Sequence, residues 1–428
     1  MSAVLFVLVL ISHAFAARTF WRPLRAGEFP STAAFAVVSV ILFYDVGITL
    51  EMAGYPYQSP YFGSLLDADQ LTVAEAMGII CIAPWLFLVG AALSKQGNAS
   101  VSRNVDLLKL RSSTKGLFLV IALGIGLVLA AYSLSRLAQG QALWVVRADV
   151  GALFGPAVLV FYFPLYFVAF FTWQRDSRGR RGAVITLVLT ILACLAPLAL
   201  GERTLLLMPP IIALVFRFRI STARLVGMAA TAVLFAALLL PVFKWQYASS
   251  DARPDQLIAA TVNDDLARAA VLRKALEVSS PVGTEIMPYP MAGYVYTALF
   301  FVPRGLAPYK GVATAQYFTG SIVGTPPEQT DWGFGIGAVE EVMTNLGTLA
   351  LVPGLLIYGV FMGWLDRLSR RFNVLIPPIR LAALFLCGYN LSSLLLLFGG
   401  MAFAALLLHQ IFVQRVQSSE GASATISV

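Results

Sequence analysis

Apolar runs of close to 20 residues recur along almost the whole chain. A helical run of that length crosses the roughly 30 Å of hydrocarbon in a lipid bilayer. Composition argues against a soluble globule, because 59% of the 428 residues are hydrophobic, only 12% are charged and the mean hydropathy is +0.80. Since lipid offers the backbone no hydrogen-bond partners, we expect an all-α polytopic membrane protein.

We expect about 11 transmembrane helices. The first apolar segment could be taken for a signal peptide, but no basic residue precedes it, whereas Arg18, Arg22 and Arg25 follow it. We therefore interpret it as a retained helix whose N-terminus lies outside. The expected helices cover roughly residues 2–17, 31–52, 71–94, 116–137, 152–173, 183–200, 204–216, 225–243, 343–364, 379–397 and 400–413.

These helices divide the chain into three regions. Residues 1–243 hold helices one to eight, residues 244–342 form a large outer loop with short helices, and residues 343–428 hold helices nine to eleven and a cytoplasmic tail. Gly399 and Gly400 leave a second way of dividing the last two helices. Long ordered loops commonly bind ligands or catalyse reactions, so function is sought in the large loop.

The distribution of basic residues predicts which loops are cytoplasmic. Strict alternation places 20 of the 30 Lys and Arg residues inside, and 7 of the other 10 lie in the large loop, which can translocate regardless of its charge. The net charge of +8 therefore reflects topology signals and does not indicate nucleic-acid binding.

Two segments of the large loop have recognisable patterns. Residues 255–279 carry apolar side chains at a helical period opposite a charged face, which indicates either an interfacial or lid helix or a packing helix. Residues 291–302 are apolar but too short to span a membrane, which favours a re-entrant or interfacial segment.

Arg203 follows Gly201 and Glu202 at a tight outer turn. The apolar run after it, residues 204–216, gives only about 20 Å of helix, so Arg203 is expected to be recessed below the outer surface. A planar guanidinium suits bidentate binding of a phosphate. The alternatives are a local pair with Glu202 or a side chain that extends to the membrane surface.

Glu340 and Glu341, followed by Asn345, lie where the ninth helix is expected to begin. The two carboxylates either complement the helix dipole or serve as a general base or sugar ligand.

Other ionisable residues lie within the expected helices. Asp45 is about fourteen residues into the second helix, where a functional role and a buried structural bond are equal alternatives. His13 and His409 lie in helices away from the large loop, so the outer site has no histidine proton shuttle. Asp67 and Asp69 fit a D-x-D metal pattern, but nucleotide sugars are cytoplasmic and this loop is not, so we expect no metal site.

Three short motifs resemble those of the Wzy-type oligosaccharide repeat-unit polymerases: GERT at 201–204, FFVPRGLAPYK at 300–310 and EEVMTNLG at 340–347. The likeness covers most of the chain and includes the helix number and the late outer loop. It implies a GT-C-like glycosyltransferase of the bacterial inner membrane with its active face in the periplasm. Such enzymes join undecaprenyl-diphosphate-linked repeat units into O-antigen or exopolysaccharide. The resemblance implies no cofactor, and it implies the lipid-linked oligosaccharide, the bilayer, a chain-length regulator and a flippase as partners.

The same resemblance implies roles for named residues. The leaving diphosphate requires fixed positive charge, and the acceptor hydroxyl requires a base. We expect Glu340 or Glu341 to be the base and Asn345 to position the acceptor. The candidates for binding the diphosphate are Arg203, Arg304, Lys310 and, in reserve, Arg147. Ala315 stands where some members have the glycine of a paired R-x10-G pattern, so this pattern is not clear here.

Two other functions are the alternatives. O-antigen ligases, which are related, use an outer-loop histidine that this chain lacks, so a polymerase is preferred to a ligase. Another polyprenyl-lipid-dependent glycosyltransferase is an open alternative of the same class. A flippase or other transporter would place charges along a path through many helices and needs no large outer loop.

Overall fold

The structure is a computed structural model, and it divides into two compact units that are treated separately. The residues it describes are 2–26, 28–54, 70–96, 101–102, 124, 127–128, 131–136, 138–141, 146, 268–282, 286–303, 305–330, 333–403 and 405–407. One unit comprises Met1–Arg103, Tyr247–Leu368 and Arg380–Leu395, and the other comprises Asn104–Gln246, Ser369–Ile379 and Leu396–Val428. Every contact reported below lies within the first unit.

The described part of the chain is mostly helical, and four of its helices are long and apolar enough to cross a membrane. This confirms the helical membrane class. The expected helices between residues 116 and 243 fall almost wholly outside the described residues, so the number eleven stays a prediction. The four candidate spans are Ala3–Arg25, Thr32–Met52, Thr72–Ser94 and Thr348–Arg371.

The first helix is longer than expected. α1 runs from Ser2 to Arg25 and does not end at residue 17. Arg22 and Arg25 occupy its last turn, where positive charge complements the free carbonyl groups of a helix end. Phe20 also packs edge to face on Phe35 of the second span, with ring centroids 5.0 Å apart. The helix thus includes the arginines that follow the apolar run.

The second span is interrupted by a π-helical turn. It consists of α2 (Thr32–Val40), the π-turn Ile41–Asp45 and α3 (Val46–Met52). Ser31 begins it by accepting a hydrogen bond from the Ala34 N–H at 3.2 Å. Single π-turns within α-helices occur frequently at functional sites, and this one carries side chains of both networks described below.

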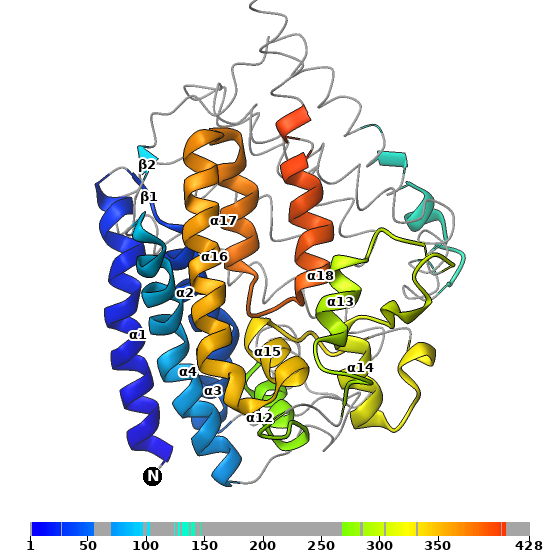
Figure 1. The fold of residues 1–428 in the computed structure, drawn as a ribbon, viewed down its shortest axis with the longest axis horizontal. Coiled ribbons are helices and arrows are strands. Elements are labelled where there is room, and N and C mark those ends of the chain that lie inside the picture. The colour runs from blue at the N-terminus through cyan, green and yellow to red at the C-terminus, as the bar shows by residue number, and fades with distance from the viewer. Residues whose placement is uncertain are drawn as a thin grey trace, which may run out of the picture. The chain divides into compact units, whose positions relative to one another are not determined.

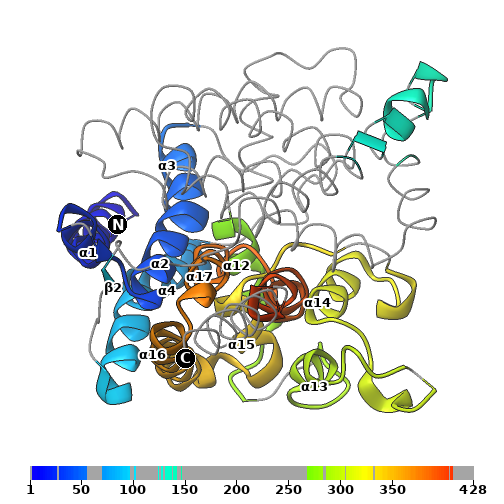
Figure 2. The same cartoon turned by 90° about the horizontal axis from the view of Figure 1, so that it is seen from above.

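The third span packs with the first two. α4 (Gln70–Ala91) continues into a π-turn, Ala92–Gln96, and contacts both α1 and α2. The three helices lie together in Figure 1 and again in the turned view of Figure 2.

The ninth expected helix, 343–364, begins later than predicted. A separate short helix, α15 (Ala338–Leu346), ends at Gly347, which has φ 87°. A residue in that conformation cannot continue a right-handed helix, so the chain restarts in a 3-10 turn, Thr348–Ala350, and then in α16 (Leu351–Arg371). Glu340 and Glu341 therefore belong to α15 and do not begin a membrane span.

The last two expected helices were divided at the wrong place. The break lies at residues 385–390 and not between 397 and 400. Asn390 starts the next helix by accepting a hydrogen bond from the Ser393 N–H at 2.8 Å, and the helical conformation then continues through Gly399. The elements are the 3-10 turn Asn373–Leu375, α17 (Ile376–Leu384), α18 (Leu391–Leu394) and the π-turn Leu395–Gly399.

The described part of the large loop is built from short helices, as expected. They are α12 (Arg268–Val278), α13 (Ala292–Ala298) and α14 (Thr314–Val323), with 3-10 turns at Pro308–Lys310 and Pro327–Gln329. α13 has only seven residues, in agreement with a segment too short to span a membrane.

α12 is a packing helix. It contacts α4, α3 and α15 and buries much of its surface, including Ala270 and Leu272. Arg273 donates two hydrogen bonds to the carboxylate of Glu51 at the end of α3, at 2.5 and 2.6 Å. Of the two interpretations of residues 255–279, the described half fits packing.

Segments expected on the cytoplasmic side meet one another. The loop after α1 forms a two-residue strand, β1 (Glu28–Phe29), which pairs antiparallel with β2 (Val101–Ser102) after α4. The end of α16 also lies at this side, because Arg367 donates a hydrogen bond to the Ser94 carbonyl at 3.5 Å. The described residues therefore agree with strict alternation for these helices.

A buried polar cluster at the same side connects α2, α16 and α17. Asp366 of α16 accepts a hydrogen bond from the Thr32 hydroxyl at 2.6 Å and another from its backbone N–H at 3.0 Å. Arg380 of α17 is fully buried and forms an ion pair with Asp366. A carboxylate at the first residue of α2 complements the N-terminal end of that helix.

Small residues let α4 and α16 approach closely. A Cβ at Gly90 would lie 2.3 Å from the Leu356 carbonyl oxygen and 2.8 Å from the Gly359 Cα. One turn further along, a Cβ at Gly363 would lie 2.1 Å from the Ser94 hydroxyl oxygen. Both helices thus show the small-xxx-small spacing that allows backbones to pack tightly in membranes.

We predict that Gly90→Ala destabilises the protein, because the new methyl group meets backbone atoms that cannot rotate away. Overpacking of this kind costs about 1–3 kcal/mol. Gly78→Ala on the same helix is the matched control, since nothing lies within 4 Å of a Cβ there. The measurement is thermal unfolding in detergent, and equal melting temperatures for the two variants would contradict the close packing.

Candidate functional site

α15 is held against the break before α18. The Ala338 N–H donates a hydrogen bond to the Leu386 carbonyl at 2.9 Å. A Cβ at Gly337 would lie 2.4 Å from the backbone of Cys387, so only glycine fits at the start of α15. This close approach brings the next turn of the helix, with its two glutamates, into the interior.

Glu340 joins α15 to the second span. Its carboxylate accepts hydrogen bonds from the Tyr44 hydroxyl at 2.8 and 3.0 Å and from the Gly337 N–H at 3.0 Å. The residue is 0% exposed, and so is Tyr44, which lies on the π-turn. The bond to Gly337 caps the N-terminus of α15.

Glu341 joins α15 to two other segments. One carboxylate oxygen accepts a hydrogen bond from the Thr314 hydroxyl of α14 at 3.1 Å, and the other accepts one from the Leu391 N–H at the start of α18 at 2.9 Å. The residue is 1% exposed. All four oxygens of the two glutamates therefore accept hydrogen bonds from the protein.

Asn345 completes the cluster. Its amide nitrogen donates to the Glu341 carbonyl at 2.9 Å and to the Thr314 hydroxyl at 3.3 Å, and its amide oxygen accepts from the Gly293 N–H at 2.9 Å. Its backbone carbonyl accepts a further bond from the Met291 N–H at 3.0 Å. Asn345 thus positions the first turn of α13 as well as the hydroxyl beside Glu341.

The two carboxyl groups titrate near neutrality. Burial raises the pKa of Glu340 from 4.5 to about 7, although the Tyr44 hydroxyl, the Gly337 N–H and the charge of Arg268 oppose this effect. Burial likewise raises the pKa of Glu341 to about 7, with a smaller contribution from the neighbouring Glu340 charge. Each group can therefore take up or release a proton at physiological pH.

A cation lies beside this cluster. The guanidinium of Arg268, at the start of α12, packs over Gly335, where a Cβ would lie 2.4 Å from one of its nitrogens. Its Nε is buried and has no hydrogen-bond partner within the described part of the chain. An unpaired buried N–H is unfavourable in itself and favourable to an incoming acceptor.

Lys310 lies away from the glutamates and is already occupied. Its ammonium group donates to the carbonyls of Leu299, Phe300 and Val302 at 3.4, 3.4 and 2.5 Å, beyond the end of α13. An ammonium group has three N–H donors, so in this structure none is left for a phosphate. Its predicted role in binding a diphosphate gains no support from this geometry.

The structure brings together Glu340, Glu341 and Asn345 from the predicted set. Arg203, Arg304 and Arg147, like Asp67 and Asp69, lie outside the described residues. Among the residues that are described, no group of three or more His, Cys, Asp or Glu side chains could hold a metal ion.

Three residues of the cluster were not predicted from the sequence. Tyr44 stands next to the singled-out Asp45 but has no motif of its own, and Thr314 lies in a short amphipathic helix. Arg268 was part of the charged face of the expected helix 255–279. Of the three, only Arg268 had a weak signal in the sequence. The glycine-rich run before α15 (residues 333–337) indicates that a large side chain packs against the backbone there, and the guanidinium of Arg268 does so at Gly335.

Comparisons with protein-family models, with curated proteins and with solved structures found no match to this chain.

The arrangement can perform proton transfer. A buried carboxyl group with a pKa of about 7, hydrogen-bonded to a hydroxyl, matches the requirement for a general base or acid near neutral pH. The hydroxyl of Thr314 shows where an oxygen can stand against Glu341, at 3.1 Å.

We predict that Glu341→Gln changes how stability depends on pH. The folded pKa of about 7 lies above the ordinary 4.5, so the folded protein holds a proton that the unfolded chain releases. The free energy of unfolding of the wild type should therefore fall by up to roughly 3 kcal/mol as pH rises from 4.5 to about 7. Above this range it should no longer change through Glu341.

Glutamine carries no exchangeable charge, so the variant should gain stability relative to the wild type across that window. Glu277→Gln, at an exposed position paired with Lys274, is the matched control and should show no such gain. Melting temperatures measured over the pH range test this, and a constant difference between the Glu341 variant and the wild type would refute the raised pKa.

Proposed function

We propose that the protein is a membrane glycosyltransferase that polymerises undecaprenyl-diphosphate-linked oligosaccharide repeat units into O-antigen or exopolysaccharide. In this proposal the reaction takes place at the periplasmic face of the inner membrane. The sequence support is the resemblance of three motifs to Wzy-type polymerases. The observation that carries the proposal is the buried Glu340–Glu341 pair beside Arg268, which offers a base and a fixed positive charge in one place.

The proposed reaction requires a base for the acceptor sugar. The acceptor hydroxyl attacks the sugar carbon that carries the diphosphate, the bond from that carbon to the phosphate oxygen breaks, and the hydroxyl proton passes to a carboxylate. We assign the base to Glu341, because one of its oxygens is bonded to the Thr314 hydroxyl, whereas the Tyr44 hydroxyl holds both oxygens of Glu340. A substrate hydroxyl that replaces Thr314 would meet the same oxygen.

The leaving diphosphate requires positive charge. Arg268 is added to Arg203, Arg304 and Arg147 as a candidate, because its Nε is without a partner in the described part of the chain. Charge-assisted hydrogen bonds from arginine to phosphate oxygens are short and strong. Asn345 keeps Thr314 and the start of α13 in place around the acceptor.

A proton-coupled transporter of the same lipid-linked oligosaccharides is the second candidate. It is favoured by one observation, an ionisable pair inside the membrane-spanning helices, His13 and Asp45, at 2.7 Å. Ionisable groups at such depth are common in proton pathways.

We predict that Glu341→Gln abolishes long-chain surface polysaccharide while single repeat units accumulate on the periplasmic face. Arg268→Ala should have the same effect, and Glu277→Gln should not. The measurement is sizing of surface polysaccharide by gel electrophoresis in a deletion strain complemented with each variant, with protein level checked by immunoblot.

The fate of the single units separates the two candidate functions. Units that face the periplasm in the deletion strain fit a polymerase. Retention of the units on the cytoplasmic side would contradict a polymerase and support a transporter. Such retention is measured as protection of the units from a glycosidase added to the periplasm.

A further inference from the structure

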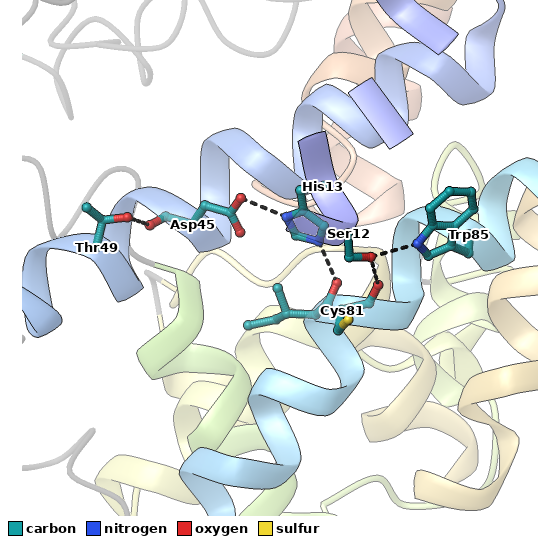
Figure 3. A network of polar contacts seen from close by, with 7 residues as sticks. Ser12, His13, Asp45, Thr49, Cys81 and Trp85 are labelled. Carbon is teal, nitrogen blue, oxygen red and sulfur yellow. Dashed lines mark hydrogen bonds and ion pairs between the residues drawn. The ribbon is translucent and has the colours of Figure 1, made fainter. Parts of the chain in front are cut away.

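A second polar network lies inside the membrane-spanning helices, away from the glutamate cluster. His13 of α1 stands between α2–α3 and α4, with Asp45 on one side and the backbone of α4 on the other (Figure 3). His13 is 2% exposed and Asp45 is 7% exposed. Hydrocarbon makes such groups costly unless they neutralise each other.

Pro84 explains why His13 forms a hydrogen bond with α4. In a helix the carbonyl of residue i accepts from the N–H of residue i+4, and Pro84 has no N–H to give to Ile80. The freed Ile80 carbonyl accepts a hydrogen bond from Nε2 of His13 at 2.9 Å. The neighbouring Cys81 carbonyl accepts one from the Ser12 hydroxyl at 3.2 Å.

This bond assigns the protons of the imidazole ring. A carbonyl oxygen can only accept, so Nε2 of His13 must carry a hydrogen. The other ring nitrogen, Nδ1, lies 2.7 Å from Oδ2 of Asp45. Two heavy atoms at that distance share a proton, which sits either on the ring or on the carboxyl group, and in both cases the pair has no net charge.

Loss of the shared proton would leave the two acceptors facing each other. The carboxylate of Asp45 would carry a full negative charge, and the nearest atom of His13 would offer a lone pair. The second oxygen of Asp45, Oδ1, is buried and has no hydrogen-bond partner within the described part of the chain. The charge would therefore be poorly stabilised as long as α1 stayed in place.

The surrounding groups do not supply an alternative partner. On the π-turn, the Tyr44 hydroxyl is directed at Glu340, and on α3 the Thr49 hydroxyl donates to the Asp45 carbonyl at 2.6 Å. On α4, the titratable neighbour is the thiol of Cys81, and Trp85 donates to Ser12 at 2.7 Å.

The charges of α12, which packs against the π-turn, are directed elsewhere. Arg273 is bound to Glu51, and Arg268 lies beside Glu340. Lys274 is paired with Glu277. None of these side chains offers Asp45 a second cation in the described structure.

α1 is the least buried of the four candidate spans. Its most apolar stretch is 28% buried, against 67% for the second span, and a row of its apolar side chains is exposed. The exposed members are Val4, Val7, Leu8, Leu10, Ile11 and Phe15.

We propose that His13 and Asp45 form an exchangeable proton-binding site within the membrane-spanning helices, and that loss of the shared proton releases α1 from the second span. The ligand of this site is the proton itself. The proposal does not depend on the glycosyltransferase function.

The test uses the chain's low histidine content. The sequence contains two histidines, so a His409→Gln background leaves His13 as the sole imidazole. The full-length protein, labelled with 15N-histidine and placed in lipid nanodiscs, is followed by NMR from about pH 5 to about pH 10. The expected result is an Nδ1 signal that changes as pH rises, because Nδ1 loses the shared proton or the carboxyl group that donated it, while the Nε2 signal stays that of a protonated nitrogen.

Asp45→Asn is the matched variant. Its amide can donate to Nδ1 with the geometry of the protonated pair, so Nδ1 should remain unprotonated over the whole range. Both proteins keep the glutamate pair, so the test is the difference between them: above the pH of the Nδ1 transition, the melting temperature of the wild type should fall relative to that of Asp45→Asn.

Two results would overturn the proposal. An Nδ1 signal of the wild type that does not move over this range would make the pair a fixed structural contact. The same transition in Asp45→Asn as in the wild type would show that Asp45 does not share the proton. If Asp45→Asn failed to fold, the Nδ1 signal of the wild type would still decide the matter, because a fixed contact predicts no transition in it.

Discussion

Backbone hydrogen bonding in a medium without water governs most of the polar contacts described above. A regular helix satisfies its own N–H and C=O groups, and every irregularity leaves some of them free. In this protein a side chain meets several of these groups. His13 meets the carbonyl freed by Pro84, Asp366 meets the first N–H of the second span, and Glu341 meets the Leu391 N–H where the helical conformation resumes.

The glutamate pair is one outcome of this constraint. Consecutive residues on a helix point about 100° apart, so neighbours of the same type can serve different segments. Glu340 reaches the second span through Tyr44, and Glu341 reaches α14 and α18. The same burial that makes the two residues useful as connectors raises their pKa values to about 7. A structural role and proton chemistry therefore arise from one arrangement and do not exclude each other.

The long apolar helices could be predicted from sequence because each is decided locally. Residues 31–52 and 71–94 agree closely with the observed spans Thr32–Met52 and Thr72–Ser94. The failures occurred where a single backbone conformation decides the boundary. Hydropathy does not register the positive φ of Gly347, so it ran α15 and α16 together.

The site was predicted in part for a similar reason. Glu340, Glu341 and Asn345 lie within about one and a half turns of one helix and share a motif, so sequence alone groups them. Tyr44 and Thr314 come from distant segments, and no local pattern connects a tyrosine in an apolar helix with a glutamate 296 residues later. Such partners become visible only in three dimensions. The occupied ammonium group of Lys310 shows the converse, since a basic residue in a suggestive motif can be used for capping carbonyls.

The sequence separation between the second span and its partners also determines the order in which its contacts can form during synthesis. Asp45 bonds to His13, and His13 bonds to α4, within the first 96 residues, so that network can form as soon as three helices have entered the membrane. Thr32 and Tyr44 instead wait for Asp366 and Glu340, which are 334 and 296 residues further on. At 5–20 residues per second, ribosomes need roughly 15–70 s to make that stretch. The polar contacts of the second span thus form at different stages of biogenesis. The bond between His13 and Asp45 can hold the N-terminal helices together before Asp366 and Glu340 have been synthesised.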